Sequence, residues 1–366
     1  MKQIGRVKKV FAAGNTGIGF HSFFQYIAGP DIQHVYVIKG GPGTGKSTLM
    51  RQVAEAVVGR GFAVEFHHCA SDIGSLDGLV VPALKVAFID GMHPHVYDPQ
   101  YPGALDQILN LGEYWDSSGI RAHQQEIMAI SGEGSRLFQS AYRYLGAARQ
   151  IHGNWAEKIG MMQDWGWVNQ QSYQLLNAIM GARPIATQPG RDRHLFASAF
   201  TPQGPKSYPE PLTGPATEVI VIKGPPGSGK STLLHKIAAA ALERGYLTEL
   251  YHSPMEPAQL QHVLLPEPDV FIATSTELFP YAPTVASQTI SLDYGLNQDK
   301  MGRHRVELET DRQTFLQLVN TAVGLIKRAR ETHMEVEGFY VANMDFAALD
   351  ELRTRLLGEI LEYATT

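Results

Sequence analysis

With 366 residues, 44% of them hydrophobic and 18% charged, the chain is long enough for two globular domains, and its composition excludes a disordered protein. The net charge of -5 at pH 7 does not indicate a nucleic-acid partner, although a local basic groove can exist within an acidic total. One cysteine excludes an internal disulfide, and the absence of an apolar N-terminal stretch or of a run of about 18 apolar residues predicts a cytoplasmic protein with no membrane partner.

Strands and helices are predicted to alternate along the first part of the chain. The β-branched run 35–38 predicts a strand, and residues 47–58 predict a helix that ends before two glycines. Residues 63–67 and 86–89 predict the next two strands. This order is typical of an α/β fold with a mostly parallel sheet covered by helices. A long helical addition is expected at about residues 115–181.

The first part of the chain is repeated in the second part. The sequence VYVIKGGPGTGKSTL at 35–49 returns as VIVIKGPPGSGKSTL at 219–233, an offset of 184 residues. The register continues beyond this segment, since His68 matches His252. Because a chance match of a short loop would not keep register for so long, we expect two similar P-loop NTPase units.

The predicted units are residues 1–190 and residues 191–366, joined by a linker rich in proline and glycine. The second unit is expected to have a shorter helical region than the first. We also expect it to contain a strand at 339–342 and a final helix at 347–363.

Two glycine-rich loops fit the pattern G-x4-G-K-[ST], each after a predicted strand and before a predicted helix. Glycines let the backbone N–H groups converge on phosphate oxygens, the lysine reaches the β- and γ-phosphates, and the serine hydroxyl ligates Mg²⁺. We therefore expect ATP or another nucleoside triphosphate, with Mg²⁺, at both loops. The expected binding residues are Gly40, Gly41, Pro42, Gly43, Thr44, Gly45, Lys46, Ser47 and Thr48 in the first loop, and Gly224, Pro225, Pro226, Gly227, Ser228, Gly229, Lys230, Ser231 and Thr232 in the second.

An acid that helps to hold the metal is predicted in the first unit alone. Asp90 follows four apolar residues at the end of a predicted strand, so Ser47 and Asp90 are expected to hold the ion there. The same register gives Thr274 in the second unit, where Ser231 remains and Glu277 is the nearest acid that could compensate. The second loop is therefore expected to bind nucleotide with doubtful turnover.

Other polar residues are candidates for catalysis beside the first loop. Asp72 and its repeat counterpart Glu256 follow the second predicted strand and could orient a water or bind a hydroxyl, with a surface turn as the alternative. Arg121, and Arg303 in the second unit, are candidates for contacting the γ-phosphate, although solvation explains most surface arginines.

Several conspicuous side chains are interpreted structurally. His68 and His252 are expected to be satisfied structural histidines, and the tryptophans at 155, 165 and 167 are expected to pack helices. Zinc is not predicted, because the histidines and the cysteine lack a standard ligand spacing. They are His67, His68, Cys69, His93 and His95.

Motifs spread along nearly the whole chain carry a family resemblance. They are the two loops, Phe11-Ala12-Ala13-Gly14-Asn15-Thr16, Ser75-Leu76-Asp77-Gly78, Ile89-Asp90-Gly91, Tyr114-Trp115-Asp116, His194-Leu195-Phe196-Ala197-Ser198-Ala199 and Met344-Asp345-Phe346. With these motifs the chain resembles a bacterial family of tandem P-loop ATPases. The resemblance implies a P-loop fold and nucleotide binding, and it implies no particular substrate.

Three functions remain open at this point. Mg²⁺-dependent hydrolysis at the first loop, with a regulatory or weak second loop, ranks first, although Asp90 is followed by Gly91 and not by a glutamate that would polarise water. A kinase comes second, with Asp72 taking the proton of an acceptor hydroxyl. A nucleotide-dependent interaction module with an unknown protein partner comes third.

Overall fold

The computed structural model describes residues 4–94, 97–284 and 286–363, which form an α/β structure with three sheets. The chain divides into two compact units. Unit 1 is made of Met1–Gly14, Ser22–Ser140 and Gly324–Thr366, and unit 2 of Asn15–His21 and Ala141–Val323. The two units have the same architecture.

The sheet of unit 1 has six strands in the order β1-β5-β6-β7-β4-β8. The bounds are β1 Val7–Val10, β4 His34–Lys39, β5 Val64–His68, β6 Leu76–Val81, β7 Val86–Asp90 and β8 Asp106–Asn110. The strands predicted at 35–38, 63–67 and 86–89 are confirmed as β4, β5 and β7. The sheet is mixed, because β6 runs antiparallel to both of its neighbours while the other pairs are parallel.

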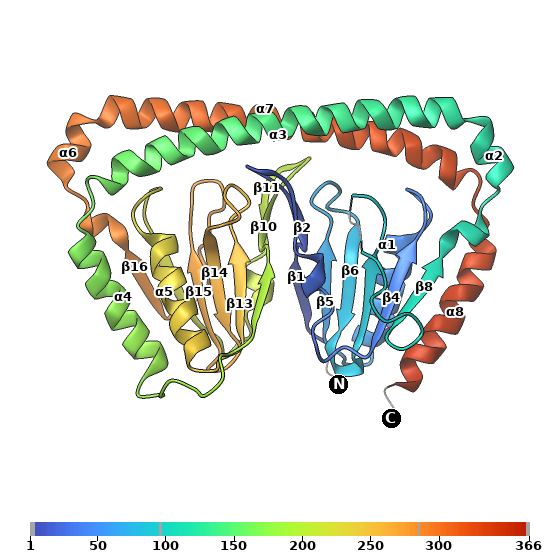
Figure 1. The fold of residues 1–366 in the computed structure, drawn as a ribbon, viewed down its shortest axis with the longest axis horizontal. Helices are drawn as coiled ribbons and strands as arrows, with labels where there is room; N and C mark the ends of the chain where they lie inside the picture. Colours follow the sequence, from blue (N-terminus) through green and yellow to red (C-terminus); the bar gives the residue numbers. More distant parts are fainter. Residues whose placement is uncertain (1–3, 95–96, 285, 364–366) are drawn as a thin grey trace. The chain divides into compact units, whose positions relative to one another are not determined.

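Two helices cover the apolar face of this sheet. Helix α1 (Lys46–Val58) buries side chains spaced three and four apart, as its amphipathic pattern predicts. Helix α8 (Phe346–Glu362) packs against α1, as Figure 1 shows, and buries four apolar residues in the same core. They are Leu349, Leu352, Leu356 and Ile360.

Unit 2 repeats this plan with the strand order β9-β13-β14-β15-β12-β16. The bounds are β9 Asp192–Leu195, β12 Glu218–Lys223, β13 Thr248–His252, β14 Leu260–Leu265, β15 Val270–Thr274 and β16 Gln288–Ser291. Helices α5 (Lys230–Glu243) and α4 (Trp165–Met180) pack together over the sheet. A small sheet is formed by β2 (Ala13–Thr16), β3 (Gly19–Ser22), β10 (Ser198–Thr201) and β11 (Gly204–Ser207).

The helical regions of the two repeats are nearly equal in length, so the expectation of a shorter second region was wrong. Helices α2 (Ser117–Ala122) and α3 (Gln124–Gly160) have 6 and 37 residues, as do α6 (Gln298–Arg303) and α7 (Arg305–Val341). The strand predicted at 339–342 was also wrong, since residues 339–341 end α7 and residue 342 lies in the turn that follows. Packing overrides their β propensity there, because Tyr340 lies against the backbone of Gly41.

The first repeat ends with helix α4, and the second repeat ends with helix α8. Each of these helices belongs to the unit whose six-stranded sheet comes from the other repeat. Helix α8 belongs to unit 1 and α4 to unit 2, and the long helices α3 and α7 are each divided between the units. This division differs from the predicted one at residue 190, because the apolar faces of α8 and α4 fill cores that the sequence order does not indicate. No helix among the described residues is both long and apolar enough to span a membrane.

Candidate functional site

The first glycine-rich loop, residues 40–47 (loop 1), connects β4 to α1 with a tightly curled backbone. Gly43 and Gly45 have φ of +70° and +90°, which side chains with a Cβ rarely adopt. A Cβ on Gly40 would lie 2.8 Å from Thr44 Oγ1, which itself donates to Gly41 O at 2.8 Å. Residues 42 and 43 lie in a turn closed by Thr44, and within the described residues the backbone N–H groups of Gly43, Gly45 and Lys46 donate no hydrogen bond. The loop therefore offers unused donors at a helix N-terminus.

Lys46 and Asp90 lie together at the carboxyl edge of the sheet of unit 1. The Lys46 ammonium donates to Gly40 O and Gly41 O, both at 2.8 Å, and lies 3.7 Å from Asp90 Oδ2. Asp90 Oδ1 accepts from the backbone N–H of Met92 at 3.0 Å. The structure thus brings the predicted lysine and acid into one ion pair.

The hydroxyl of Ser47 is an acceptor in this arrangement. It accepts from the N–H of Leu76 at 3.1 Å and more weakly from Arg51 Nε at 3.4 Å. A cation at this hydroxyl would have to displace the guanidinium of Arg51, which is exposed on α1. Thr48 follows in the first turn of the helix.

The second glycine-rich loop, residues 224–231 (loop 2), has a closely similar geometry in unit 2. Gly227 and Gly229 have φ of +78° and +103°, and Lys230 Nζ donates to Gly224 O at 2.6 Å and to Pro225 O at 2.7 Å. Burial lowers the pKa of Lys230 to about 8, and the negative charge of Asp293 opposes this shift. The cationic form of this lysine is therefore less favoured than in water.

The counterparts of Ser47 and Thr48 are placed alike. Ser231 accepts from the N–H of Leu260 at 3.1 Å, as Ser47 does from Leu76, and Thr232 lies in the first turn of α5.

Loop 2 lacks a carboxylate at the position of Asp90. Thr274 is buried, and its N–H donates to His262 Nδ1 at 3.2 Å. Burial lowers the pKa of His262 to about 3, so this ring is neutral and can accept. Glu277 is hydrogen-bonded by Arg312 through Nε at 3.0 Å and through Nη2. The described contacts of Glu277 do not bring it to Lys230, so it does not replace Asp90 in this structure.

Each loop packs against one of the long helices. A Cβ on Gly43 would lie 3.1 Å from Glu337 O of α7, and a Cβ on Gly227 would lie 1.9 Å from Ala156 O of α3. Gly227 is thus required both by its positive φ and by the helix backbone beside it.

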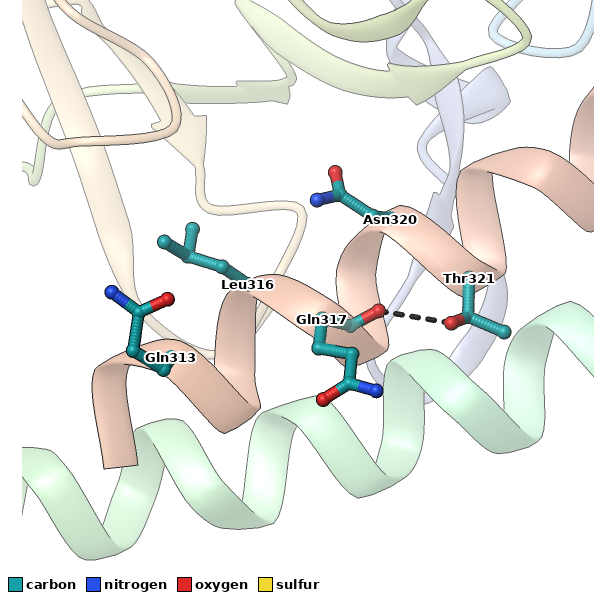
Figure 2. Close-up of a pocket in the computed structure, with 5 residues that line it drawn as sticks. All are labelled: Gln313, Leu316, Gln317, Asn320 and Thr321. Carbon is teal, nitrogen blue, oxygen red and sulfur yellow. Dashed lines mark hydrogen bonds between the residues drawn. The ribbon is translucent and has the colours of Figure 1, made fainter. Parts of the chain in front are cut away.

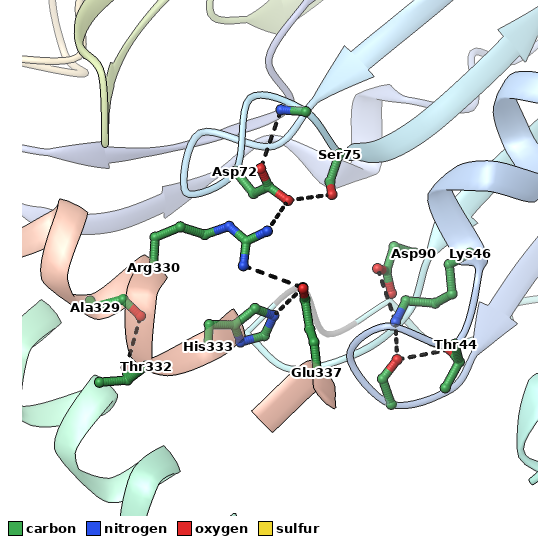
Figure 3. Close-up of polar contacts among 12 residues, drawn as sticks. Thr44, Lys46, Asp72, Ser75, Asp90, Ala329, Arg330, Thr332, His333 and Glu337 are labelled. Carbon is green, nitrogen blue, oxygen red and sulfur yellow. Dashed lines mark hydrogen bonds and ion pairs between the residues drawn. The ribbon is translucent and has the colours of Figure 1, made fainter. Parts of the chain in front are cut away.

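An arginine from a long helix is paired with an acid in each unit. In unit 1, Figure 3 shows Arg330 of α7 between Asp72, at 2.9 Å from Nη2, and Glu337, at 3.4 Å from Nη1. Asp72 also accepts from Ser75 Oγ at 2.6 Å, and His333 Nε2 lies 3.5 Å from Glu337. Asp72 can be identified as a candidate from the sequence, but its partner Arg330 cannot, because Arg330 lies on a helix of the other repeat, far away in the chain.

The corresponding pair in unit 2 is Arg149 Nε with Glu256 Oε2. Arg149 and Arg330 hold matching positions, seven residues before Ala156 and Glu337, respectively.

Two arginines and two histidines considered in the sequence differ in their surroundings in this structure. Arg121 in α2 and Arg303 in α6 are exposed, and among the described residues no hydrogen bond or ion pair joins either arginine to loop 1 or loop 2. Burial lowers the pKa of His68 and of His252 to about 4, and each Nδ1 contacts a backbone carbonyl. These two histidines are therefore neutral and structural.

The tryptophans pack against other residues. Trp155 contacts the ring of Phe315, and Trp165 Nε1 donates to Gly160 O at 3.0 Å. The carbons of Trp165 and Trp167 lie against Gly229 and Gly295, respectively.

Sequence analysis missed the role of Asp77 as a buried acid near loop 1. Burial raises its pKa to about 7, while the hydrogen bond with Cys69 and the charge of Lys46 oppose the shift. Asp77 lies on β6, a strand that was not predicted.

Two other features of the described residues do not form a ligand site. The described residues contain no cluster of three or more His, Cys, Asp or Glu side chains placed to hold a metal; His95 lies outside them. Figure 2 shows a shallow hollow on α7, lined by neutral residues of this helix alone. They are Gln313, Leu316, Gln317, Asn320 and Thr321.

Comparisons of this chain with models of protein families, with curated proteins and with solved structures found no match.

Proposed function

We propose that both units are P-loop NTPase domains, that each loop binds a nucleoside triphosphate with Mg²⁺, and that hydrolysis takes place at loop 1. ATP is the nucleotide expected from the resemblance to tandem ATPases. The observation that carries this proposal is the pairing of Lys46 with Asp90, at 3.7 Å, beside a curled glycine loop with unused N–H donors.

The residues of loop 1 fit a triphosphate. A chain of anionic oxygens needs converging donors, a positive charge and room close to the backbone. The N–H groups of Gly43, Gly45 and Lys46 supply the donors, and Lys46 supplies the charge. A Cβ at Gly40 would crowd Thr44, so the glycine keeps the backbone accessible. Lys46 now donates to two loop carbonyls, and phosphate oxygens would compete for these hydrogens.

The same site fits Mg²⁺ at Ser47 and, through water, at Asp90. When bound, the ion would neutralise phosphate charge and polarise the transferred phosphoryl group. Asp90 is kept in place by the N–H of Met92 and by Lys46, so its carboxylate is fixed before the ion binds. Arg51 would leave the Ser47 hydroxyl, which its exposed position allows.

Asp72 does not support the kinase alternative. A base that receives the proton of an acceptor hydroxyl needs an accessible lone pair within hydrogen-bond reach. In this structure the carboxylate of Asp72 accepts from Ser75, Gly74 and Arg330. The pairing of Lys46 with Asp90 supports hydrolysis at loop 1, so hydrolysis is proposed first and the kinase second.

Loop 2 is proposed as a binding site that regulates loop 1. It has the same lysine and serine contacts as loop 1, which supports nucleotide binding. Its lack of the Asp90 carboxylate removes the charge that would hold the ion's water ligands.

The proposal is tested by measuring Mg²⁺-dependent phosphate release from ATP. Lys46→Ala and Asp90→Asn are expected to lower the turnover rate by at least about 100-fold, since each removes charge that stabilises the transition state. Lys230→Ala is expected to change the dependence of the rate on ATP concentration. Exposed Lys327→Ala is the control and is expected to match the natural protein. Equal loss of the maximal rate in Lys46→Ala and Lys230→Ala at saturating ATP would contradict the division of roles.

A further inference from the structure

One face of α7 lies along loop 1. Arg330, His333, Glu337 and Tyr340 are spaced by three and four residues and therefore share this face. The backbone of Glu337 contacts Gly43, and the ring of Tyr340 contacts Gly41. Arg330 lies two helical turns before Glu337, about 10 Å along the axis.

Electrostatics place this face near the loop lysine as well. Burial is the main cause that lowers the pKa of His333. The negative charge of Glu337 opposes this shift, and the positive charge of Lys46 adds to it. Figure 3 shows Arg330, His333 and Glu337 in the same region as Lys46 and Asp90. The face thus brings a second cation to the surroundings of loop 1.

The guanidinium of Arg330 is held by two carboxylates. Asp72 contacts Nη2 at 2.9 Å and Glu337 contacts Nη1 at 3.4 Å, and the arginine side chain is only 17% exposed. A planar guanidinium binds carboxylates and phosphates through the same donors. A phosphate group with a greater negative charge than one carboxylate can therefore compete for Arg330.

The arginine–acid pair occurs in both units, whereas the Asp90 carboxylate occurs in one. Arg149 of α3 pairs with Glu256, and α3 contacts Gly227 through Ala156 as α7 contacts Gly43 through Glu337. The arginine–acid pair is therefore present wherever a glycine-rich loop is present, whether or not that unit also has an acid at the position of Asp90. This association points to recognition of the nucleotide, in addition to any role in hydrolysis.

We propose that Arg330 is the residue that distinguishes a nucleoside triphosphate from a diphosphate at loop 1, by exchanging Asp72 for the γ-phosphate. Asp72 holds the guanidinium when no γ-phosphate is present. Arg149 and Glu256 act in the same way at loop 2. This inference rests on the proposed function, because it requires nucleotide binding at loop 1.

The test compares the affinities of loop 1 for ADP and for an ATP analogue with a β,γ-imido bridge, with Mg²⁺. Titration calorimetry on the full chain in the Lys230→Ala background isolates loop 1. Arg330→Ala is expected to weaken binding of the analogue by about 10- to 100-fold and that of ADP by less than about 2-fold, because one charge-assisted contact to the γ-phosphate is lost. Arg330→Lys is expected to recover part of the preference, and Lys327→Ala serves as the control on the same helix.

Asp72→Asn distinguishes recognition from a merely structural ion pair. If Asp72 competes with the γ-phosphate, this variant is expected to bind the analogue at least about 3-fold more tightly, with ADP affinity unchanged. A structural pair would instead give equal losses for both nucleotides.

Circular dichroism and unchanged ADP affinity show that each variant is folded. An unchanged ratio of analogue to ADP affinity in Arg330→Ala would overturn the inference and leave nucleotide binding intact. Binding of neither nucleotide by the Lys230→Ala parent would overturn the proposed function at loop 1 and this inference with it.

Discussion

Asp77 is a carboxyl group buried beside Cys69 and near the ammonium of Lys46, and burial raises its pKa to about 7. In the unfolded chain an aspartate ionises near pH 3.9. The folded state therefore holds a proton that the unfolded state releases between about pH 4 and pH 7. This difference makes folding less favourable as the pH rises through that window.

Asp77→Asn should remove the dependence of stability on this proton. The variant is expected to unfold with a free energy close to that of the natural protein at pH 4, and up to about 4 kcal/mol higher at pH 8. The difference is measured by unfolding the full chain in urea at several pH values, with hydrogen exchange of the amides of unit 1 as the readout. A constant difference between pH 4 and pH 8 would show that Asp77 is ionised in the folded protein.

Lys230 gives a second pH-dependent prediction, which concerns nucleotide binding and not folding. Because burial lowers its pKa to about 8, part of the Lys230 population is neutral at pH 8.5 in the free protein. A bound triphosphate would favour the ammonium and raise this pKa, so binding at loop 2 should take up protons at pH 8.5.

Calorimetry in buffers of different ionisation enthalpy, in the Lys46→Ala background, measures this uptake at loop 2. Lys230→Arg is the matched control, because arginine stays protonated and should show no uptake. Uptake of equal size in the control would assign the proton to another group.

At the scale of helices and strands, α8 belongs to the core of unit 1 although it ends the second repeat. Leu356→Ala is therefore expected to lower the stability of unit 1 by about 2–5 kcal/mol, the usual cost of a cavity in a packed core. Leu175→Ala in α4 is expected to affect unit 2 in the same way. Hydrogen exchange at β7 and β15 reports on the two units separately. Protection lost at β15 alone in Leu356→Ala would contradict the exchange of helices.

Local patterns allowed part of this structure to be predicted. The strands β4, β5 and β7, the helix α1 and the glycine loops carry strong signals within about ten residues of chain, and the structure contains them. The strand β6 begins with the sequence LDG, in which an acid and a glycine interrupt the apolar run, so its pattern was not recognised.

Contacts distant in sequence could not be predicted. The end of α7 has the composition of a strand, and only its contact with loop 1 explains the helix. The pairing of Arg330 with Asp72 joins residues 258 positions apart. The repeat matches Arg330 with Arg149, but it does not show which residues they contact. Arg121 was named instead because of its similar position to Arg303.

At the scale of the whole molecule, neither repeat contains a complete unit. The sheet of each unit needs a helix supplied by the other repeat, and the long helices α3 and α7 contribute residues to both units. The proposed regulation of loop 1 by loop 2 would have to act through α3 and α7, the helices whose residues belong to both units.

The central claim is that both loops bind a triphosphate, and counting bound nucleotides tests it most directly. Native mass spectrometry with Mg²⁺ and the β,γ-imido analogue of ATP should find two nucleotides per chain. It should find one in Lys46→Ala, one in Lys230→Ala, and none in the double variant, because each lysine supplies the charge at its loop. A natural protein that binds no analogue, or two lysine variants that still bind two, would contradict the account.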